Sequence, residues 1–438
     1  MNEAGKQDGA ALEDILCIDL TRVLGGPFAT MILADQGARI VKVEPPTGDD
    51  TREWGPPFRV NEDGTKDSSY FLGVNRNKQS IALDLANPLG RGVLKQVLSG
   101  ADILIENFRP GTMEKWQLDY PLLREQFPRL VYCRLSGFGS DGPMATRPGY
   151  DAVIQGMSGL MSINGTPESG PTRVGTAVVD MVSGLYCANA ILMALHERTR
   201  SGRGQFIDIA LFDCALTLLH PHIANYFLTG QRPVATGNSH PNIAPYDRYR
   251  TRTGYIVVTS GSQAQFHNLC SVLNMLSLAE DERFKSNEER VTHRTELNEL
   301  LQERLLHEDG EVLCERLMFV GVPAGKVQCI DKVIADPQII HRDMILKIGE
   351  WTGINTPIKF SRSQSSKRSE PPSFGCDTES ILRTHGYSEK EICDLKNAGV
   401  ALCRKRSIKV APVALRTENV AEPPRSRGSA PHGADRVG

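Results

Sequence analysis

Residues 15–44 read ILCIDLTRVLGGPFATMILADQGARIVKVE, and this stretch decides the fold. A short apolar run leads into a glycine-rich turn, a helix-like segment and a second strand-like run. Strand, turn, helix and strand within about thirty residues form a βαβ unit, which is typical of a doubly wound parallel sheet. The turn at Gly25, Gly26 and Pro27 opens a helix whose free N–H groups can face an anion. It lacks the G-x-G-x-x-G pattern, so nothing in it indicates NAD.

The same pattern continues along the chain. Strand-like runs follow at 79–84, 101–106, 129–135 and 206–211, separated by helical segments. We therefore predict an α/β protein with a large Rossmann-like parallel sheet.

The domain boundaries follow from changes in composition. The large domain begins with residues 15–228; a Pro-, Gly- and Asn-rich linker then leads into a smaller α/β domain, at 229–335, that contains a strand at 254–259. Residues 336–403 are expected to return to the large domain. The ends, 1–14 and 404–438, have too few large apolar residues to order themselves, so we predict disorder there.

One carboxylate stands out in the centre of the chain. Residues 173–195, RVGTAVVDMVSGLYCANAILMAL, place Asp180 where a β-branched run meets a segment that is apolar on nearly every side. Such a segment predicts a buried helix, and a buried carboxylate needs stabilisation, which the positive end of the helix can supply. The alternative is that Asp180 is simply an N-cap, a position that Asp commonly takes.

Composition limits the function classes. At 438 residues, two domains are expected, and a net charge of −2 gives no general field for nucleic acid. Ten scattered cysteines, without C-x-x-C pairs or zinc spacing, indicate reduced thiols and no metal site. No uninterrupted apolar run predicts a membrane span, and the polar N-terminus resembles no signal peptide. We expect a cytoplasmic protein, or a mitochondrial matrix protein if a presequence has been removed.

Basic residues near strand ends suggest an anion-binding face. Lys78 precedes one strand, Asn107-Phe108-Arg109-Pro110 follows another, and Arg147 lies in a later loop. Each could be an ordinary solvated side chain. If they converge on one sheet edge, they can bind phosphates and a pyrophosphate, with Phe108 and Pro110 as an apolar wall for an adenine ring.

Together these segments carry a family resemblance. It rests on VLGGPFATMILADQGARIVKVEPPTGDDTR, NRNKQSIALDL, IENFRPG, SGFGSDGP followed by RPGYDAV, SGLMSINGTP, VVD and GRGQFIDIALFD. In this order and spacing, from about residue 15 to about residue 400, they resemble the class III CoA-transferases. The resemblance implies a large domain built from both chain ends, an inserted small domain and an interlocked homodimer. It also implies coenzyme A thioesters as substrates and no permanently bound cofactor.

The resemblance assigns roles to individual residues. Asp180 matches the catalytic aspartate, which attacks an acyl-CoA to form an anhydride and then an aspartyl-CoA thioester, from which the acceptor acid takes CoA. We expect a low pKa for this acid, held by the helix N-terminus. CoA is expected against Val23, Leu24, Gly25, Lys78, Asn107, Phe108, Lys115 and Arg147. Substrate or oxyanion contacts are expected from Gly26, Tyr150, Ser260, Gly261 and Ser262.

Two other functions remain open. The same fold hosts α-methylacyl-CoA racemases, but their Gly-His-Asp motif is here Gly149-Tyr150-Asp151, and a tyrosine shuttles protons poorly at neutral pH. A non-catalytic acyl-CoA-binding protein is the other alternative. Among transferases, the stretch PNIAPYDRYRTRTGYIVV most resembles enzymes that use succinyl-CoA and a dicarboxylate such as glutarate. Arg22, Arg52 or Arg173 could bind the second carboxylate.

Overall fold

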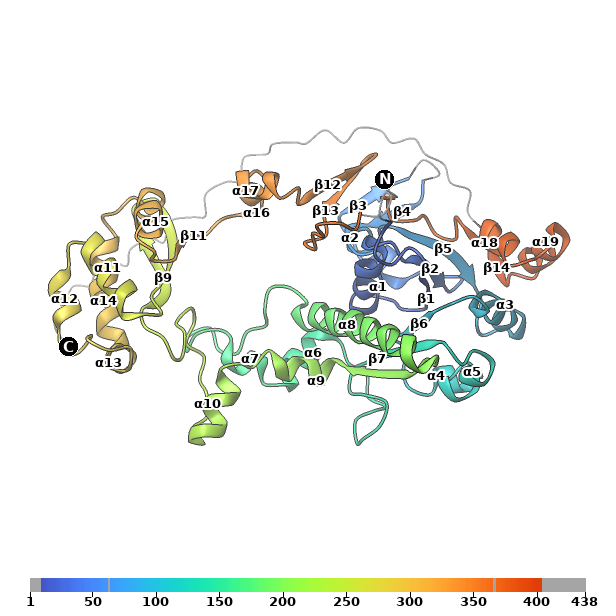
Figure 1. Ribbon diagram of the computed structural model, residues 1–438, viewed down its shortest axis with the longest axis horizontal. Coiled ribbons are helices and arrows are strands. Elements are labelled where there is room, and N and C mark those ends of the chain that lie inside the picture. The colour runs from blue at the N-terminus through green and yellow to red at the C-terminus, as the bar shows by residue number, and fades with distance from the viewer. Residues whose placement is uncertain (1–8, 62–63, 365–367, 404–438) are drawn as a thin grey trace, which may run out of the picture.

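A seven-stranded sheet forms the largest part of the molecule (Figure 1). The structure, a computed structural model, describes residues 9–61, 64–364 and 368–403. The strands lie in the order β14-β5-β2-β1-β6-β7-β8, and all pairs are parallel except β14 with β5. Their bounds are β1 (Leu16–Asp19), β2 (Arg39–Glu44), β5 (Lys78–Leu83), β6 (Ile103–Glu106), β7 (Val131–Ser136), β8 (Phe206–Ala210) and β14 (Ala401–Leu402). The predicted α/β class with a large parallel sheet is confirmed.

Helices cover both faces of this sheet. In β1, Leu16 and Ile18 enter one hydrophobic core and Cys17 the other, so most sheet strands are apolar on both sides. The first core packs against α3 (Pro88–Leu98), α4 (Thr112–Lys115), α5 (Tyr120–Gln126), α18 (Thr378–Thr384) and α19 (Glu389–Asn397). The second packs against α1 (Gly25–Asp35), α6 (Asp151–Met157), α7 (Leu160–Ile163), α8 (Val178–Ser201) and α9 (Leu211–Thr217).

Both ends of the described chain contribute to this body. β14 pairs with β5 in the register Ala401 with Leu83. The prediction of disorder for 1–14 is wrong for residues 9–14, because the Leu12 N–H donates to the Gln36 carbonyl oxygen at 2.9 Å and Leu12 packs against the second core. The rest of the predicted disorder, 1–8 and 404–438, lies outside the described residues.

A second, smaller body has a core of its own, lying at the left of Figure 1. Its three antiparallel strands are β9 (Tyr246–Thr251), β10 (Gly254–Thr259) and β11 (Ala324–Lys326). Its helices are α11 (Gln263–Val272), α12 (Leu276–Glu280), α13 (Asn287–Thr292), α14 (Arg294–Leu305) and α15 (Gly310–Phe319). The predicted strand 254–259 coincides with β10, whereas the exact domain boundaries stay a prediction.

Shorter elements connect and flank the two bodies. The small body is joined through α10 (His222–Thr229) on one side and through α16 (Ile330–Val333) and α17 (Pro337–His341) on the other (Figure 1). The hairpin β12 (Ile345–Ile348) and β13 (Trp351–Ile354) then packs on α2 (Ser69–Gly73) through Trp351 and Phe71. A 3-10 helix (Asp50–Glu53) and the hairpin β3 (Phe58–Val60) and β4 (Lys66–Ser68) lie before α2.

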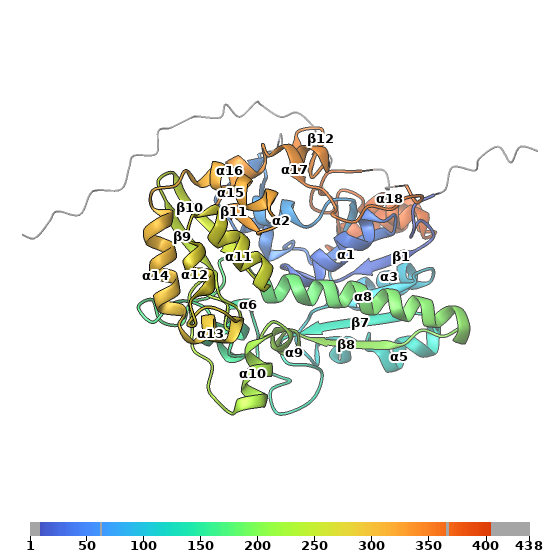
Figure 2. The same ribbon diagram turned by 60° about the vertical axis from the view of Figure 1, so that its left-hand side comes forward.

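The long helix α8 lies along the sheet (Figure 2). Its length and mean hydropathy of 1.7 would suffice to cross a membrane. However, it packs against α1, α6, α9, β7 and β8, which makes it a core helix of this body. The prediction that it is buried on nearly every side is wrong, because Leu185, Tyr186, Leu192 and Met193 form an exposed apolar side in the single chain.

Candidate active site

A cleft of about 670 Å³ opens at the carboxyl-terminal edge of the parallel sheet. Its walls are the segments that follow β1, β2, β5, β6 and β7, and Asp180 of α8 lies at one side. The strand order reverses between β1 and β6, and ligands of such sheets bind at that point because the connecting loops diverge there. The sheet topology therefore places a binding cleft beside Asp180.

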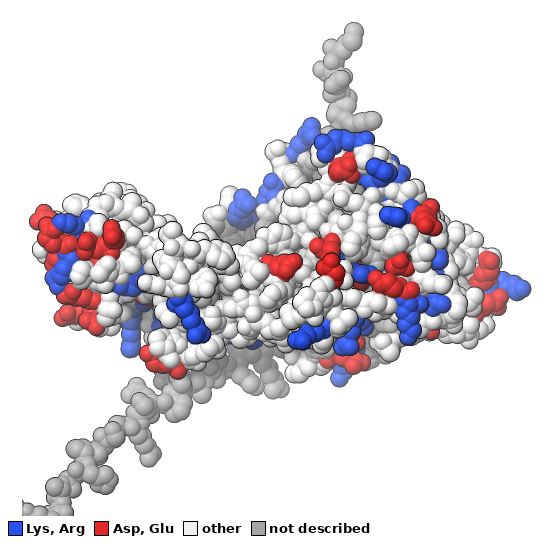
Figure 3. All heavy atoms as spheres, turned by 90° about the horizontal axis from the view of Figure 1, so that it is seen from below, with Lys and Arg blue, Asp and Glu red and all other residues white. Residues whose placement is uncertain are grey.

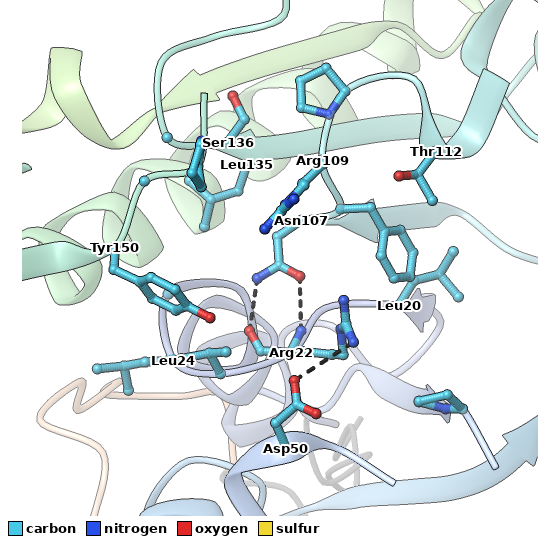
Figure 4. Close-up of a pocket in the computed structure, with 18 of the residues that line it drawn as sticks. Leu20, Arg22, Leu24, Asp50, Asn107, Arg109, Thr112, Leu135, Ser136 and Tyr150 are labelled. Atoms are coloured by element: carbon cyan, nitrogen blue, oxygen red, sulfur yellow. Dashed lines mark hydrogen bonds and ion pairs between the residues drawn. The ribbon is translucent and has the colours of Figure 1, made fainter. Parts of the chain in front are cut away.

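The turn from β1 to α1 forms one wall and is held by Asn107 (Figure 4). The Asn107 amide accepts the Arg22 N–H at 2.9 Å and donates to the Arg22 carbonyl oxygen at 2.7 Å. The next residue, Val23, has φ of +70°, a conformation that a β-branched residue adopts only when its surroundings enforce it. The two hydrogen bonds of Asn107 thus help to stabilise this backbone conformation.

Paired charges lie beneath this turn. Lys42 Nζ lies 2.8 Å from Asp49 Oδ2 and donates to the Thr21 carbonyl oxygen at 2.7 Å. Lys78 Nζ lies 3.1 Å from Asp19 Oδ2, and all four charged side chains are fully buried. Burial alone would raise the pKa of Asp49, but the Lys42 ammonium outweighs it and lowers this pKa to about 2. Each buried charge here has a partner of opposite sign.

Asp180 lies in a different environment. It is the third residue of α8, and its carboxylate receives no hydrogen bond and no ion pair from the residues that the structure describes. Burial raises the pKa of the Asp180 carboxyl to about 7, and the neighbouring Asp151 carboxylate adds to the shift. The expectation of a low pKa is wrong, because the N–H groups at this helix end bind a different carboxylate.

That carboxylate belongs to Asp151, the first residue of α6. Asp151 Oδ2 accepts the N–H of Val179 at 2.8 Å and of Asp180 at 3.2 Å. The N-cap position of α8 is Ala177, which has no side chain able to cap. The alternative that Asp180 is itself the N-cap is therefore wrong.

Two glycines bring α8 against the β1–α1 turn. A Cβ on Gly184 would lie 2.6 Å from the Gly25 carbonyl oxygen, and a Cβ on Gly25 would lie 3.1 Å from the Asp180 carbonyl oxygen. Because real Cβ atoms do not approach backbone oxygen so closely as 2.6 Å, any side chain at Gly184 would push the two helices apart. This close approach sets the position of Asp180 relative to the cleft.

Two tyrosines lie near Asp180. Tyr150 lines the cleft, where Figure 4 shows its ring beside Leu24, and its side chain is 58% exposed. Tyr70 of α2 packs into the same small cluster as Leu24 and Met181. Burial raises the pKa of Tyr70 to about 12, with further contributions from Asp180, Asp151 and Asp49. The Tyr70 hydroxyl therefore remains a protonated donor at neutral pH.

The other end of the cleft combines aromatic rings with cations. Phe108 and Trp116 pack edge to face with ring centroids 5.2 Å apart, and Arg22 lies over the Phe108 ring at 5.3 Å. Glu106 accepts the Phe108 N–H at 2.8 Å, which fixes the loop after β6. Arg109, from the same loop, points toward Asn107 (Figure 4). This end suits an aromatic ring system that carries phosphates.

Comparison with known proteins identifies the family. A profile described as CoA-transferase family III matches residues 12–378. The chain belongs to this family.

Individual relatives support this assignment. This CoA-transferase is 41% identical over 378 residues to a succinate–glutarate CoA-transferase of Agrobacterium fabrum, covering 85% of this chain and 94% of the relative. It is 38% identical over 401 residues to the human succinyl-CoA:glutarate CoA-transferase, covering 89% of each chain. A crystal structure of a CAIB/BAIF family protein from Brucella suis superposes with a TM-score of 0.78 at 40% identity, covering 86% of this chain and all of that one.

The structure brings most of the predicted site residues of this transferase into one cleft. Those that line it are Asp180, Val23, Leu24, Gly25, Asn107, Phe108, Arg147 and Tyr150. Residues from segments distant in sequence thus meet at one edge of the sheet, as expected from the shared direction of the strands.

The remaining predicted residues lie elsewhere. Lys78 is the first residue of β5, at the amino end of the strand. Its ammonium donates hydrogen bonds to Asp19, Asn75 and the Pro27 carbonyl oxygen. Lys115 is exposed on α4 and does not line the cleft. Gly26 is buried against Thr21, behind the wall.

Ser260, Gly261 and Ser262 lie in the small body, between β10 and α11. They are not part of the cleft in this single chain. Ser260 is fully buried, and Ser262 caps α11 by accepting the Gln265 N–H at 3.2 Å. The hydrogen bonds of this segment to α11 give it a structural role that needs no substrate.

The arginines suggested for a second carboxylate differ in availability. Arg52 is buried between Glu44 and Asp67, at 2.7 and 2.6 Å, so it cannot bind a substrate without breaking both ion pairs. Arg22 lines the cleft and lies 3.7 Å from Asp50. Arg173 is exposed and donates to the Val174 carbonyl oxygen.

Sequence reasoning missed two parts of the site. One is the end of β5 and the segment that follows it, Leu83 to Ala86, which lines the cleft. The polar residues that follow that apolar strand could have revealed it, because ligands gather at carboxyl ends of parallel strands rather than at amino ends such as Lys78. The other is the contact of Asp151 with α8, which joins residues 29 positions apart and has no local sequence signal. No group of three or more metal-ligating side chains occurs among the described residues.

Proposed function

We propose that this enzyme transfers coenzyme A from succinyl-CoA to a small dicarboxylic acid, with Asp180 as the covalent nucleophile. The observation that carries the proposal is a half-buried carboxylate that lines a cleft and has no cationic partner among the described residues. A carboxylate that is largely removed from water without a structural partner is costly, and such groups concentrate at catalytic sites.

The chemistry proceeds by exchange at the Asp180 carboxyl. A carboxylate oxygen attacks the thioester carbon, the carbon–sulfur bond breaks, and CoA leaves as a thiolate, which gives a mixed anhydride. The thiolate then attacks the aspartyl carbon and releases the donor acid as a carboxylate, which gives an aspartyl-CoA thioester. The acceptor carboxylate repeats both steps in reverse order. Because its pKa is raised, the Asp180 carboxylate is more basic than that of an ordinary aspartate, which makes it the stronger nucleophile once it is ionised.

The surroundings suit the two halves of an acyl-CoA. The N–H groups of the β1–α1 turn, at Leu24 and Gly25, lie beside Asp180 and can donate to a developing oxyanion. Phe108 and Trp116 can contact the adenine ring, and Arg22, Arg109 and Arg147 can bind the phosphates. Tyr150 and Tyr70 can donate hydrogen bonds to the acyl or acceptor carboxylate.

The substrate class rests on the relatives. Two of them are named for succinyl-CoA or succinate together with glutarate, at 41% and 38% identity over most of both chains. This supports succinyl-CoA as donor and a dicarboxylate as acceptor. Arg22, at the cleft wall, is the better placed of the suggested arginines to bind a remote carboxylate, because Arg52 is already engaged on both sides.

The proposal includes an interlocked homodimer in the cytoplasm. Phe227 and Leu228 of α10 and Phe319 of α15 are 76%, 87% and 92% exposed in the single chain, in addition to the apolar side of α8. The face toward which α10 projects has a broad area with few charged side chains between charged regions (Figure 3). Apolar exposure on this scale supports a second copy as its cover. The six buried cysteines form no disulfide among the described residues, which supports a reducing compartment.

Mass spectrometry of the intact protein tests the proposal. After incubation with succinyl-CoA, wild-type protein should gain the mass of CoA in thioester linkage, located to the peptide containing Asp180 and removed by hydroxylamine. Asp180→Asn should gain none and should lose acyl exchange by at least about a thousandfold.

Asp213→Asn is the matched control, because Asp213 is likewise the third residue of a helix, α9, but lies outside the cleft. It should form the adduct normally. Exchange between succinyl-CoA and glutarate without an Asp180 adduct would contradict the mechanism. Exchange of the α-hydrogen for deuterium without any acceptor acid would indicate a racemase instead. Undiminished CoA binding with no exchange for any acid would indicate a binding protein.

A further inference from the structure

Asp151, which lies on α6, caps the first turn of α8 with its carboxylate. Asp151 is 7% exposed, and its Oδ2 accepts the N–H groups of both Val179 and Asp180. Helix caps normally come from the residue just before the helix. Here the preceding residue is Ala177, and the cap comes from α6 instead.

Gln155, one turn further along α6, completes the attachment. Its side chain is fully buried, and its amide donates to Asp151 Oδ1 at 2.6 Å. The same side chain accepts the Val174 N–H at 2.9 Å, in the segment that leads into α8. Asp151 therefore receives three N–H donors, and an ionised carboxylate, which is acceptor-only, suits all three.

This arrangement places two carboxyl groups at one helix end. Asp180 faces Asp151 from α6, Tyr70 from α2 and Tyr150 from the loop before α6. The charged groups on the other elements packed against α8 are engaged or directed elsewhere: Asp35 on α1 with Arg76, Arg134 on β7 with Glu106, Asp208 on β8 with the Ser140 N–H, and Asp213 exposed on α9. Asp151 is thus the charged group that acts most directly on Asp180.

We propose that Asp151 is a positioning residue that holds the first turn of α8 and destabilises the negative charge of Asp180 until that residue is acylated. This inference rests on the proposed function and adds a role for a residue that does not touch the substrate. In the acylation step, the bond from Asp180 to the acyl carbon forms, the carbon–sulfur bond breaks, and the negative charge leaves with the CoA thiolate. The repulsion from Asp151 is present before this step and absent after it, so it favours the acylated enzyme.

Titration of the protein without substrate tests the electrostatic part directly. In pH-difference infrared spectra, the protonated-carboxyl band that disappears in Asp180→Asn should titrate with a midpoint near 7. In Asp151→Asn, whose amide oxygen can still accept N–H groups, the midpoint should fall by about one pH unit. Asp151→Ser, a neutral residue that also caps helices, should shift it in the same direction if the asparagine variant folds poorly.

Asp309→Asn is the matched control. Asp309 also accepts two N–H groups at a helix start, those of Glu311 and Val312, but it lies in the small body. Its variant should leave the midpoint where it is in the wild type. A midpoint that does not move in either Asp151 variant would overturn the proposal.

The same variants separate this inference from the proposed function. For succinyl-CoA, the acid limb of the kcat/KM profile should move to lower pH in Asp151→Asn, and kcat/KM at pH 8 should fall roughly tenfold. A purely structural role predicts a lower Tm with an unmoved acid limb. An Asp180 adduct in the wild type together with an unmoved midpoint overturns only the role of Asp151. Absence of the adduct in the wild type overturns the proposed function, and with it the effect on acylation.

Discussion

The carboxylates on the two sides of the β1–α1 turn lie in opposite electrostatic environments. Beneath the turn, Asp49 is paired with Lys42, and Asp19 with Lys78, in full burial. On the cleft side, Asp180 has no cationic partner among the described residues, and its nearest charged neighbour is another carboxylate. The pKa of Asp49 is lowered to about 2, whereas that of Asp180 is raised to about 7.

This difference separates structural from functional charge. A paired buried charge is compensated in the native state and serves the fold. An uncompensated one costs stability and persists only where function requires it. We therefore expect removal of a carboxylate to destabilise the protein beneath the turn and to stabilise it on the cleft side. Three measurements test this contrast and the role of the cleft.

The largest effect is expected beneath the turn. Asp49→Asn removes the partner of Lys42 and leaves a fully buried ammonium unpaired, so the free energy of unfolding should fall by about 3–5 kcal/mol. Because the folded pKa of Asp49 lies below its usual value, this stabilisation is present above about pH 4 and disappears as the pH falls through about 2. Urea denaturation between pH 2 and 8 measures both the loss in the variant and its pH dependence.

The control for this prediction is an exposed pair. Asp281→Asn breaks an ion pair with Arg283 that lies on the surface, and it should change the unfolding midpoint very little. An equal loss in both variants would show that burial does not distinguish the charges beneath the turn.

On the cleft side, a smaller change of opposite sign is expected. Asp180→Asn should stabilise the protein at pH 8 by about 1–2 kcal/mol, because solvent in the open cleft screens part of the cost of the half-buried charge. The folded pKa of Asp180 is raised, so its unfavourable contribution grows as the pH rises from about 4 through about 7. The gain in Tm over wild type should therefore shrink between pH 8 and pH 5. A variant less stable than wild type at pH 8 would contradict an uncompensated charge at this site.

The exposed cations at the mouth of the cleft should have the smallest effect. Arg109→Ala should raise KM for succinyl-CoA roughly five- to tenfold at low ionic strength, with less effect at high salt. Lys115→Ala is the matched control, because Lys115 is exposed nearby on α4 but does not line the cleft. Its KM should stay within about twofold of wild type. The reverse order of effects would place the nucleotide end of the substrate on α4.

The fold could be predicted where the pattern is local. Apolar runs of four to six residues marked β1, β2, β5 to β8 and β10, because apolar side chains concentrate in strands that face a core, even where, as in β8 and β10, only part of the strand is buried. The same reasoning overstated the burial of α8, since an apolar sequence does not say whether its outer side is covered by the same chain or by another. Residues 9–14 are held by the hydrogen bond from Leu12 to Gln36, just after α1, and by packing of Leu12 on the second core, which composition cannot reveal.

The site could be predicted where its residues match a family motif or lie at the end of a strand. Family resemblance located Asp180, and strand ends located Asn107, Phe108 and Arg147. Lys78 was misplaced because it precedes its strand, so it lies at the amino end, away from the cleft. The raised pKa of Asp180 could not be anticipated, because it depends first on desolvation in the folded chain and then on the capping carboxylate of Asp151 from α6.

The pairing of β14 with β5 has a consequence for synthesis on the ribosome. The edge of β5 is completed by late residues: Ala401 and Leu402 pair with it, and the side chains of Asp377 and Thr378 accept its N–H groups at Ser80 and Ala82. Because a chain is synthesised from its amino end, β5 is made long before the residues near 400 that pair with its edge. Until then it offers unpaired backbone groups to other nascent strands, so we expect this edge to be a site of chaperone contact during synthesis.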